Sequence, residues 1–328
     1  MQRNYNIDVL KILLAFIIVL HHTPSPFHDS LQPITTCAVP IFFMISGYLM
    51  FGKVITYERL MNNALRIMKI LLYSLLFYYT YYYIRKGTLY IPSIKDTLLF
   101  VFSNNEPLIG HLWYLSAYAY TLFIIAFLVK KNKTLYVKLL AITGLVLYLL
   151  FDIWHIYDNI PKYLTLVYIF RNFFFTAIPM FYIGTLFSHN PPPHTHIRVT
   201  PLNRLISCEW YVLFLMIIFI GICSLIEINV LHLNHIADIY FCTIPLSASL
   251  FVFFICHKIY NINVLASLGE KYSLFVYILH PVIIKGLIDF TGKDTYYAGV
   301  VAFLLTLVIS IIFVKIRDYY IQNLYSSK

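Results

Sequence analysis

Ten apolar segments, each long enough or nearly long enough to cross a bilayer as a helix, constrain this sequence more than any other feature. A spanning helix needs about 20 predominantly apolar residues. The segments therefore predict an all-α, polytopic membrane protein with about ten transmembrane helices. The expected spans are residues 6–23, 34–52, 64–84, 111–129, 135–153, 164–187, 205–226, 236–257, 272–290 and 296–316.

The composition places the chain in the same class. Hydrophobic residues make up 60% of it and charged residues only 12%, with a mean hydropathy of +0.77, whereas soluble domains carry roughly 25% charged residues. The net charge of +10 has an ordinary explanation, because membrane proteins retain Lys and Arg in cytoplasmic loops. The expected partner of this basic chain is therefore the lipid bilayer, and no binding of nucleic acid is expected.

The distribution of Lys and Arg predicts the orientation. If the N-terminus is cytoplasmic, seventeen of the 24 basic residues fall on or near the inner side, six fall outside, and Arg171 lies within a span. This asymmetry, together with an even number of spans, favours two cytoplasmic termini. Lys11 interrupts the first apolar core and no small-residue cleavage site follows, so the first span is not a signal peptide. Residues 1–328 are expected to form a single integral-membrane domain with no appended soluble domain.

No metal site is expected. The five cysteines show no C-x-x-C or other ligand spacing, and most lie inside apolar runs. His189, His194 and His196 fall in a Pro-rich loop that cannot present them on one helix face, and no Cys or carboxylate joins them. This loop is interpreted as a linker.

The first span carries two ionisable residues on one face. Lys11 and His22 are eleven residues apart, which on an α-helix is about 16.5 Å of rise and three turns with a remainder of roughly 20°. Asp8, three residues before Lys11, is placed to pair with it. Ionisable groups at membrane depth are functional candidates, but Lys11 snorkelling to the headgroups while His22 caps the outer end is an open alternative. His21 is rotated by about 80° from this stripe.

A basic strip follows the second span. Arg66 and Lys69 are neighbours on one helix face, and Arg59 lies two turns earlier on the same face. Such a strip at the cytosolic surface either contacts lipid phosphates or holds a soluble phosphate-bearing donor, because both residue types bind phosphate.

Five short motifs resemble, in the same order, those of the acyltransferase 3 family of membrane O-acyltransferases. D-V-L-K, ten residues and His22 look like its D-G-L-R-x10-H opening, and V-P-I-F-F-M-I-S-G-Y-L-M is similar to its V-D-x-F-F-V-x-S-G-F-L-I. R-I-M-K at Arg66 resembles its R-x-x-R, H-L-W-Y-L at His111 its H-x-W-F-L, and Y-S-L-F-V-Y-I-L-H-P-V its S-Y-S-L-Y-L-x-H-x-P. Together these motifs cover nearly the whole chain.

The chain departs from the family pattern at three points. Lys11 and Lys69 stand where Arg is commoner, which keeps the charge but loses the planar fork. Pro40 replaces the usual Asp, so the role of that carboxylate is unfilled here or supplied elsewhere. The hydrolase-like domain that some members append is not expected here.

The resemblance implies an acyltransferase of the bacterial cytoplasmic membrane. It would take an acyl group, most often acetyl, from cytosolic acyl-CoA and pass it to a hydroxyl of a cell-envelope glycan or its lipid-linked precursor. His22 and Lys11 are then the candidate catalytic residues, with His22 as general base and an acyl-histidine as the less favoured variant. Arg59, Arg66 and Lys69 would hold the anionic end of acetyl-CoA. The rival class is a ten-helix transporter or flippase of glycolipid precursors.

Other polar residues are weaker candidates. His111, Trp113 and Arg171 are assigned to an acceptor pocket, in which Arg would meet phosphate or carboxylate, although each alone is also expected as a structural residue. Ser46, beside Gly47, suits close helix packing. The roles of Glu209 and of His280, which precedes Pro281, stay open, with helix packing favoured for His280.

Overall fold

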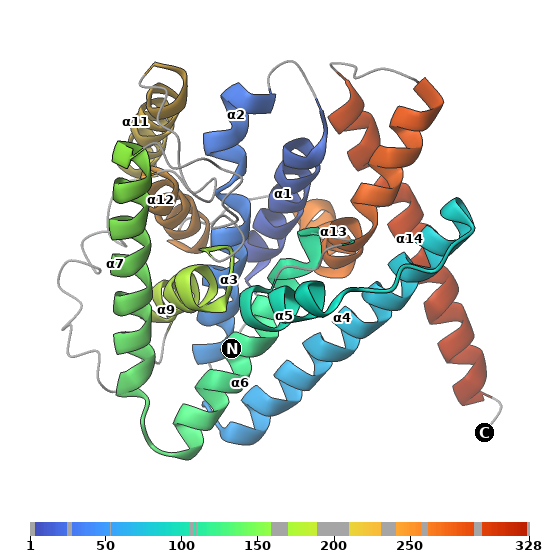
Figure 1. Cartoon of the computed structure of the whole chain (residues 1–328), viewed down its shortest axis with the longest axis horizontal. Coiled ribbons are helices and arrows are strands. Elements are labelled where there is room, and N and C mark those ends of the chain that lie inside the picture. The colour runs from blue at the N-terminus through green and yellow to red at the C-terminus, as the bar shows by residue number, and fades with distance from the viewer. Residues whose placement is uncertain are drawn as a thin grey trace. The chain divides into compact units, whose positions relative to one another are not determined.

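The computed structural model describes residues 4–24, 28–52, 54–104, 108, 110–158, 170–188, 210–230, 241–256, 262–291 and 297–326. Regular secondary structure within these ranges is helical throughout, without a strand (Figure 1). The all-α class expected from the apolar segments is confirmed.

Eight helical stretches in the described part are long and apolar enough to cross a membrane, and two shorter apolar helices accompany them. The long stretches comprise α1 (Tyr5–His22), α2 with α3 (His28–Thr35 and Ala38–Phe51), α4 (Tyr57–Lys86), η1 with α6 (Gly110–Leu112 and Trp113–Lys130), α7 (Leu135–Asp158), α11 (Trp210–Asn229), α13 (Asn263–Thr291) and α14 (Ala298–Ser326). The two shorter ones are η2 with α9 (Phe173–Ala177 and Ile178–Leu186) and α12 (Thr243–Cys256). The chain is a polytopic membrane protein. Parts of four predicted spans, namely residues 164–169, 205–209, 236–240 with 257, and 296, lie outside the described residues.

Several helices extend past the spans that hydropathy predicts. The helix α4 begins at Tyr57, because the side chain of Thr56 accepts a hydrogen bond from the backbone N–H of Arg59 at 3.2 Å. It ends where Gly87 adopts a left-handed conformation with φ of 69°. Capping residues set these ends, whereas hydropathy reports only the apolar part of a helix. The helices α13 and α14 also extend past the predicted spans, since α13 begins at Asn263 and α14 continues to Ser326.

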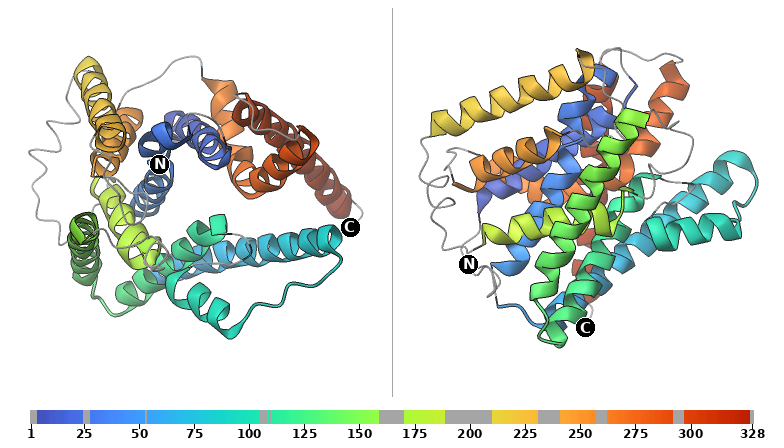
Figure 2. Two further views of the ribbon diagram at one scale, coloured as in Figure 1. Left: turned by 45° about the horizontal axis from the view of Figure 1, so that its top comes forward. Right: turned by 60° about the vertical axis from the view of Figure 1, so that its left-hand side comes forward.

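The chain divides into two compact units, and the division falls within α3. Of the described residues, the first unit comprises those within 43–188, and the second comprises those within 4–42, 210–230 and 241–326. In the first unit α4 packs along α6, while α9 and η2 pack on α7. In the second unit α13 packs on both α1 and α14 (Figure 2), and α11 packs on α12 and α2.

Two glycines in the first unit bring α3 and α9 into backbone contact. A Cβ atom on Gly47 would lie 2.0 Å from the carbonyl oxygen of Phe181, and one on Gly184 would lie 2.0 Å from that of Met44. Small residues permit this approach between membrane helices. The packing role expected for the Ser46 and Gly47 pair is therefore confirmed for Gly47.

A short helix lies between α4 and α6. The segment from Ile94 forms α5 (Ile94–Ser103), which starts with a capping box: Ser93 donates from its hydroxyl at 2.7 Å and from its backbone N–H at 3.0 Å to Oδ2 of Asp96. These hydrogen bonds, above all the one from the Ser93 hydroxyl, lower the pKa of Asp96 because they favour its ionised form.

Candidate active site

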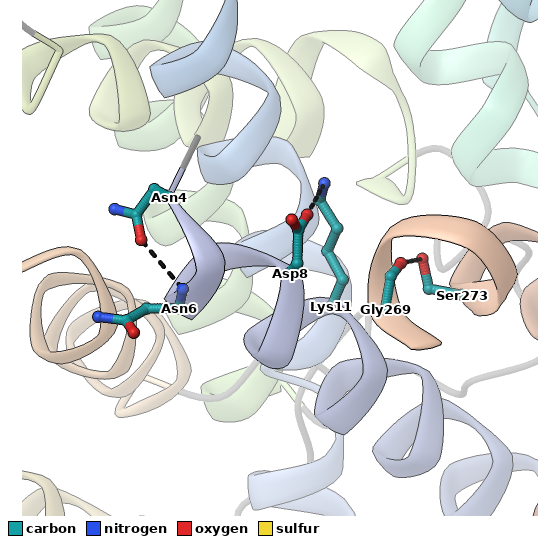
Figure 3. Close-up of polar contacts among 6 residues, drawn as sticks. All are labelled: Asn4, Asn6, Asp8, Lys11, Gly269 and Ser273. Atoms are coloured by element: carbon teal, nitrogen blue, oxygen red, sulfur yellow. Dashed lines mark hydrogen bonds and ion pairs between the residues drawn. The ribbon is translucent and has the colours of Figure 1, made fainter. Parts of the chain in front are cut away.

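The first helix holds the predicted Asp8 and Lys11 pair. Asn4 caps α1 by accepting from the backbone N–H of Asn6 at 3.0 Å, and the helix then continues without interruption to His22. The Lys11 Nζ atom lies 3.0 Å from Asp8 Oδ1 (Figure 3), and the side chains keep 23% and 9% of their surface exposed. The ion pair expected from the three-residue spacing is confirmed, and Lys11 is a paired cation on a mostly buried face.

The helix α13 touches α1 at the level of this ion pair. A Cβ atom on Gly269 would lie only 1.7 Å from the carbonyl oxygen of Asp8. One turn along α13, the hydroxyl of Ser273 donates to the carbonyl of Gly269 at 2.7 Å, and Figure 3 shows this turn beside Asp8 and Lys11. Only a residue without a side chain allows the two backbones to approach this closely.

Four imidazoles gather at the other end of α1, all within the second unit. His22 is exposed, and its ring centroid lies 5.1 Å from that of His21 and 5.1 Å from that of His280. The ring of His28 on α2 lies 5.8 Å from His21. Across the described residues, no group of three His, Cys, Asp or Glu side chains is arranged to hold a metal ion.

His21 has a structural partner on α2. Its Nδ1 lies 3.0 Å from the hydroxyl oxygen of Thr35, and that hydroxyl donates to the carbonyl of Gln32 at 3.2 Å. The Thr35 hydroxyl thus links the ring of His21 to the backbone of α2. His21 therefore ties α1 to α2.

His280, for which helix packing is the favoured role, is buried on α13 and also lies beside His22. Its side chain is completely buried on α13, and its Nδ1 lies 2.7 Å from the carbonyl oxygen of Tyr277. The sequence carried one indication of this position, since His280 belongs to the last of the five motifs. Nothing in its spacing pointed to His22, because the two residues lie on helices far apart in the chain.

The three residues of the basic strip on α4 differ in their exposure and in their hydrogen bonds. Arg66 and Lys69 are exposed. Arg59 instead donates to the carbonyl of Val54 at 3.1 Å and to that of Leu49 at 3.3 Å, so that it closes the C-terminal end of α3. These bonds satisfy orphan carbonyls at the end of a helix, and they make Arg59 a structural residue as well as a candidate for phosphate binding.

Two tyrosines that the sequence did not single out complete a polar cluster near this strip. Tyr114 and Tyr118, one turn apart on α6, both hydrogen-bond to Ser46 on α3. Arg66 and Arg59 lie close enough to Tyr118 to act on its phenol electrostatically. The four-residue spacing of the tyrosines was the available signal, since it puts both on one helix face.

The predicted acceptor residues all belong to the first unit. His111 lies in η1, directly before α6, with its Nε2 3.4 Å from the hydroxyl of the buried Tyr78. Trp113 is partly exposed, with its ring 6.1 Å from that of Phe43. Arg171 is partly exposed and directly precedes Asn172, which caps η2. Glu209 and the three loop histidines lie outside the described residues.

Comparison with known proteins points to one family. The sequence model of the acyltransferase 3 protein family, described as an acyltransferase domain, matches residues 4–315. An amino-acid racemase from Enterococcus faecalis is 33% identical over 130 residues, which cover 35% of this chain and 18% of the racemase. The chain thus spans less than a fifth of the length of that relative. No solved structure matches.

Proposed function

We propose that this chain, which belongs to the acyltransferase 3 family and is a membrane acyltransferase, moves an acetyl group from acetyl-CoA to a hydroxyl of an extracytoplasmic or lipid-linked glycan. The proposed location is the bacterial cytoplasmic membrane. The observation that carries the proposal is the exposed imidazole of His22 at the end of a membrane helix, with a second imidazole packed against its ring.

In the proposed reaction His22 is the general base. It takes the proton of the acceptor hydroxyl while the hydroxyl oxygen attacks the thioester carbonyl carbon. The new C–O bond forms as the C–S bond breaks, and the electron pair stays on the sulfur of CoA. The imidazolium then returns its proton to that thiolate, so no other reactant is needed. An imidazole suits both transfers because it titrates near neutral pH.

Lys11 has a different part in this proposal. About 16.5 Å of helix separates it from His22, so the two side chains cannot act on the same reacting atoms. Lys11 instead sits in an ion pair with Asp8 at 3.0 Å, from which it can offer its remaining donors to a polar part of the donor. We therefore propose that Lys11, a candidate catalytic residue by sequence, binds the acyl donor and takes no part in the chemical step.

The exposed basic residues of α4 are proposed to hold the phosphates of CoA. Replacing Arg66 with alanine is expected to raise the apparent KM for acetyl-CoA more than it lowers kcat, because the contact exists in the ground state and the transition state alike. Lys69→Ala should have a smaller effect, since Lys acts as a point charge. Steady-state kinetics on purified protein measure both values.

Arg85 provides the matched control for Arg66. It is an exposed arginine near the far end of the same helix, where its guanidinium donates to the hydroxyl of Tyr81 at 3.1 Å. Arg85→Ala should leave the KM for acetyl-CoA unchanged. If Arg66→Ala and Arg85→Ala give the same donor KM in folded protein, the donor phosphates bind elsewhere.

His111, Trp113 and Arg171 are proposed to contact the acceptor. Arg171 can meet a phosphate or carboxylate of a lipid-linked or acidic glycan with two parallel hydrogen bonds. An aromatic ring and an imidazole that are both partly exposed suit a sugar, which offers apolar faces and hydroxyl groups.

The function itself is tested by mass spectrometry of envelope glycans from cells with and without the gene. The expected result is a glycan species heavier by one acetyl group in cells that carry the gene. In parallel, purified protein should consume acetyl-CoA when the acceptor is present. Unchanged glycans combined with no consumption of acetyl-CoA would contradict the proposal and favour a transporter or flippase.

A further inference from the structure

Pro281 creates an unusual hydrogen-bonding position in the middle of α13. The helix runs from Asn263 to Thr291 with this proline inside it. Proline has no backbone N–H, so the carbonyl of Tyr277, four residues earlier, loses the intrahelical bond that it would otherwise accept. A buried carbonyl left without a donor is costly.

The side chain of His280 supplies the missing donor. Its Nδ1 lies 2.7 Å from the Tyr277 carbonyl oxygen and 3.2 Å from that of Val276. A carbonyl oxygen accepts and cannot donate, so Nδ1 must carry a proton, and Nε2 is then the acceptor nitrogen of the neutral ring. The proline thus fixes the tautomer of His280 through the backbone.

The fixed ring lies next to His22. The two centroids are 5.1 Å apart with an angle of 34° between the planes, and the buried Nε2 atom of His280 accepts no hydrogen bond from a described residue in this structure. At this centroid distance, a turn of the exposed His22 ring would bring one of its nitrogens within hydrogen-bonding reach of that Nε2. His280 is completely buried whereas His22 is exposed. One ring is therefore held rigidly by the protein, and the other can meet a substrate.

We propose that His280 is a positioning residue whose Nε2 accepts the N–H of His22 once the exposed His22 ring turns toward it. A neutral imidazole has one N–H and one lone pair, on opposite nitrogens. Holding the His22 N–H toward His280 leaves the lone pair on the other nitrogen, where it can take the proton of the acceptor hydroxyl. This inference rests on the proposed function, because it assigns His280 a role through the base His22. Partners of this kind fix tautomer and ring orientation in other histidine sites.

The test compares two amide substitutions at His280. Asn carries its amide near the position of Nδ1, so His280→Asn keeps a donor for the Tyr277 carbonyl but has no atom at the place of Nε2. Gln reaches further, and the oxygen of its amide can stand where Nε2 was. We expect kcat to fall about 10- to 100-fold in His280→Asn, the range seen when orienting partners of histidine are removed, with an unchanged KM for acetyl-CoA. His280→Gln should recover a large part of the loss.

A purely structural role predicts the reverse order. If His280 serves only to satisfy the Tyr277 carbonyl, His280→Asn should be as active as the unmodified protein, and that result would overturn the proposal. So would equal activities of the Asn and Gln variants. If the Asn variant does not accumulate, His280→Leu replaces it, because Leu fills similar volume without an acceptor; a Gln variant no better than Leu would also contradict the inference.

The variant His22→Ala distinguishes a failure of the positioning role of His280 from a failure of His22 as the general base. If His22→Ala is inactive while His280→Asn is fully active, the positioning role fails and the general base stands. If His22→Ala acylates glycans at the normal rate, the base assignment itself fails, and the role of His280 fails with it.

Discussion

Replacing His22 with alanine is expected to lower glycan acylation by about 10²- to 10⁴-fold, the loss typical of a positioned general base. Binding of acetyl-CoA should persist, because the proposed phosphate-binding residues lie on α4. The side chain is exposed at the end of α1, so its removal leaves no cavity in the core. Acylation is measured by the acetyl content of glycans, and donor binding by titration of purified protein.

His21→Ala is the matched control for this experiment. His21 precedes His22 on the same helix, and its Nδ1 hydrogen-bonds Thr35 at 3.0 Å. Its loss should cost about 1 kcal/mol of stability, the usual net worth of such a bond, and leave most of the activity in place. Both variants are compared at equal membrane abundance. A His22→Ala protein that accumulates normally and acylates at a near-normal rate would show that His22 is not the base.

Replacing Gly269 with alanine is expected to prevent α1 and α13 from packing as they do. The new Cβ would lie 1.7 Å from the carbonyl oxygen of Asp8 and 3.3 Å from the backbone nitrogen of Ile12. Both contacts are with backbone, so no side chain can rotate away and the helices must separate. Overpacking usually costs about 1–3 kcal/mol, occasionally more, and a clash with backbone falls at the upper end.

Gly286→Ala is the control on the same helix. Apart from its own helix backbone and chain neighbours, no atom of the described residues lies within 4 Å of a Cβ built at Gly286. Alanine in a helix interior is favoured over glycine by roughly 0.5–1 kcal/mol, so this variant should melt at the same temperature as the unmodified protein or slightly higher. Thermal unfolding in detergent and membrane abundance measure the difference. Equal melting temperatures for Gly269→Ala and Gly286→Ala would show that the helices separate at no cost.

The consequence of Gly269→Ala should reach function as well as stability. The clash falls at Asp8, whose carboxylate pairs with Lys11. It also displaces α1, the helix that ends at His22. Any Gly269→Ala protein that folds and accumulates in the membrane is therefore expected to have a lower specific acylation activity. Gly286→Ala should retain the normal specific activity.

The sequence by itself determined the membrane class, the helical fold and the polar stripe of the first helix. Each of these follows from local information. A run of about 20 apolar residues specifies a spanning helix, and the separation of Asp8, Lys11 and His22 along one helix specifies which of them share a face. The order of the five motifs also placed the chain in its family before any helix was positioned.

Tertiary structure alone decided which helix packs against α1 and what its histidines contact. The sequence does not distinguish Gly269 from other helical glycines, and only the packed structure shows that the carbonyl of Asp8 lies against it. The pairing of His22 with His280 joins α1 to α13, and the use of Arg59 at the end of α3 joins α4 to that helix. Hydropathy and helix periodicity describe each segment separately. Contacts between distant segments depend on shape complementarity and on which backbone groups are left without partners, and these properties exist only once the helices are packed.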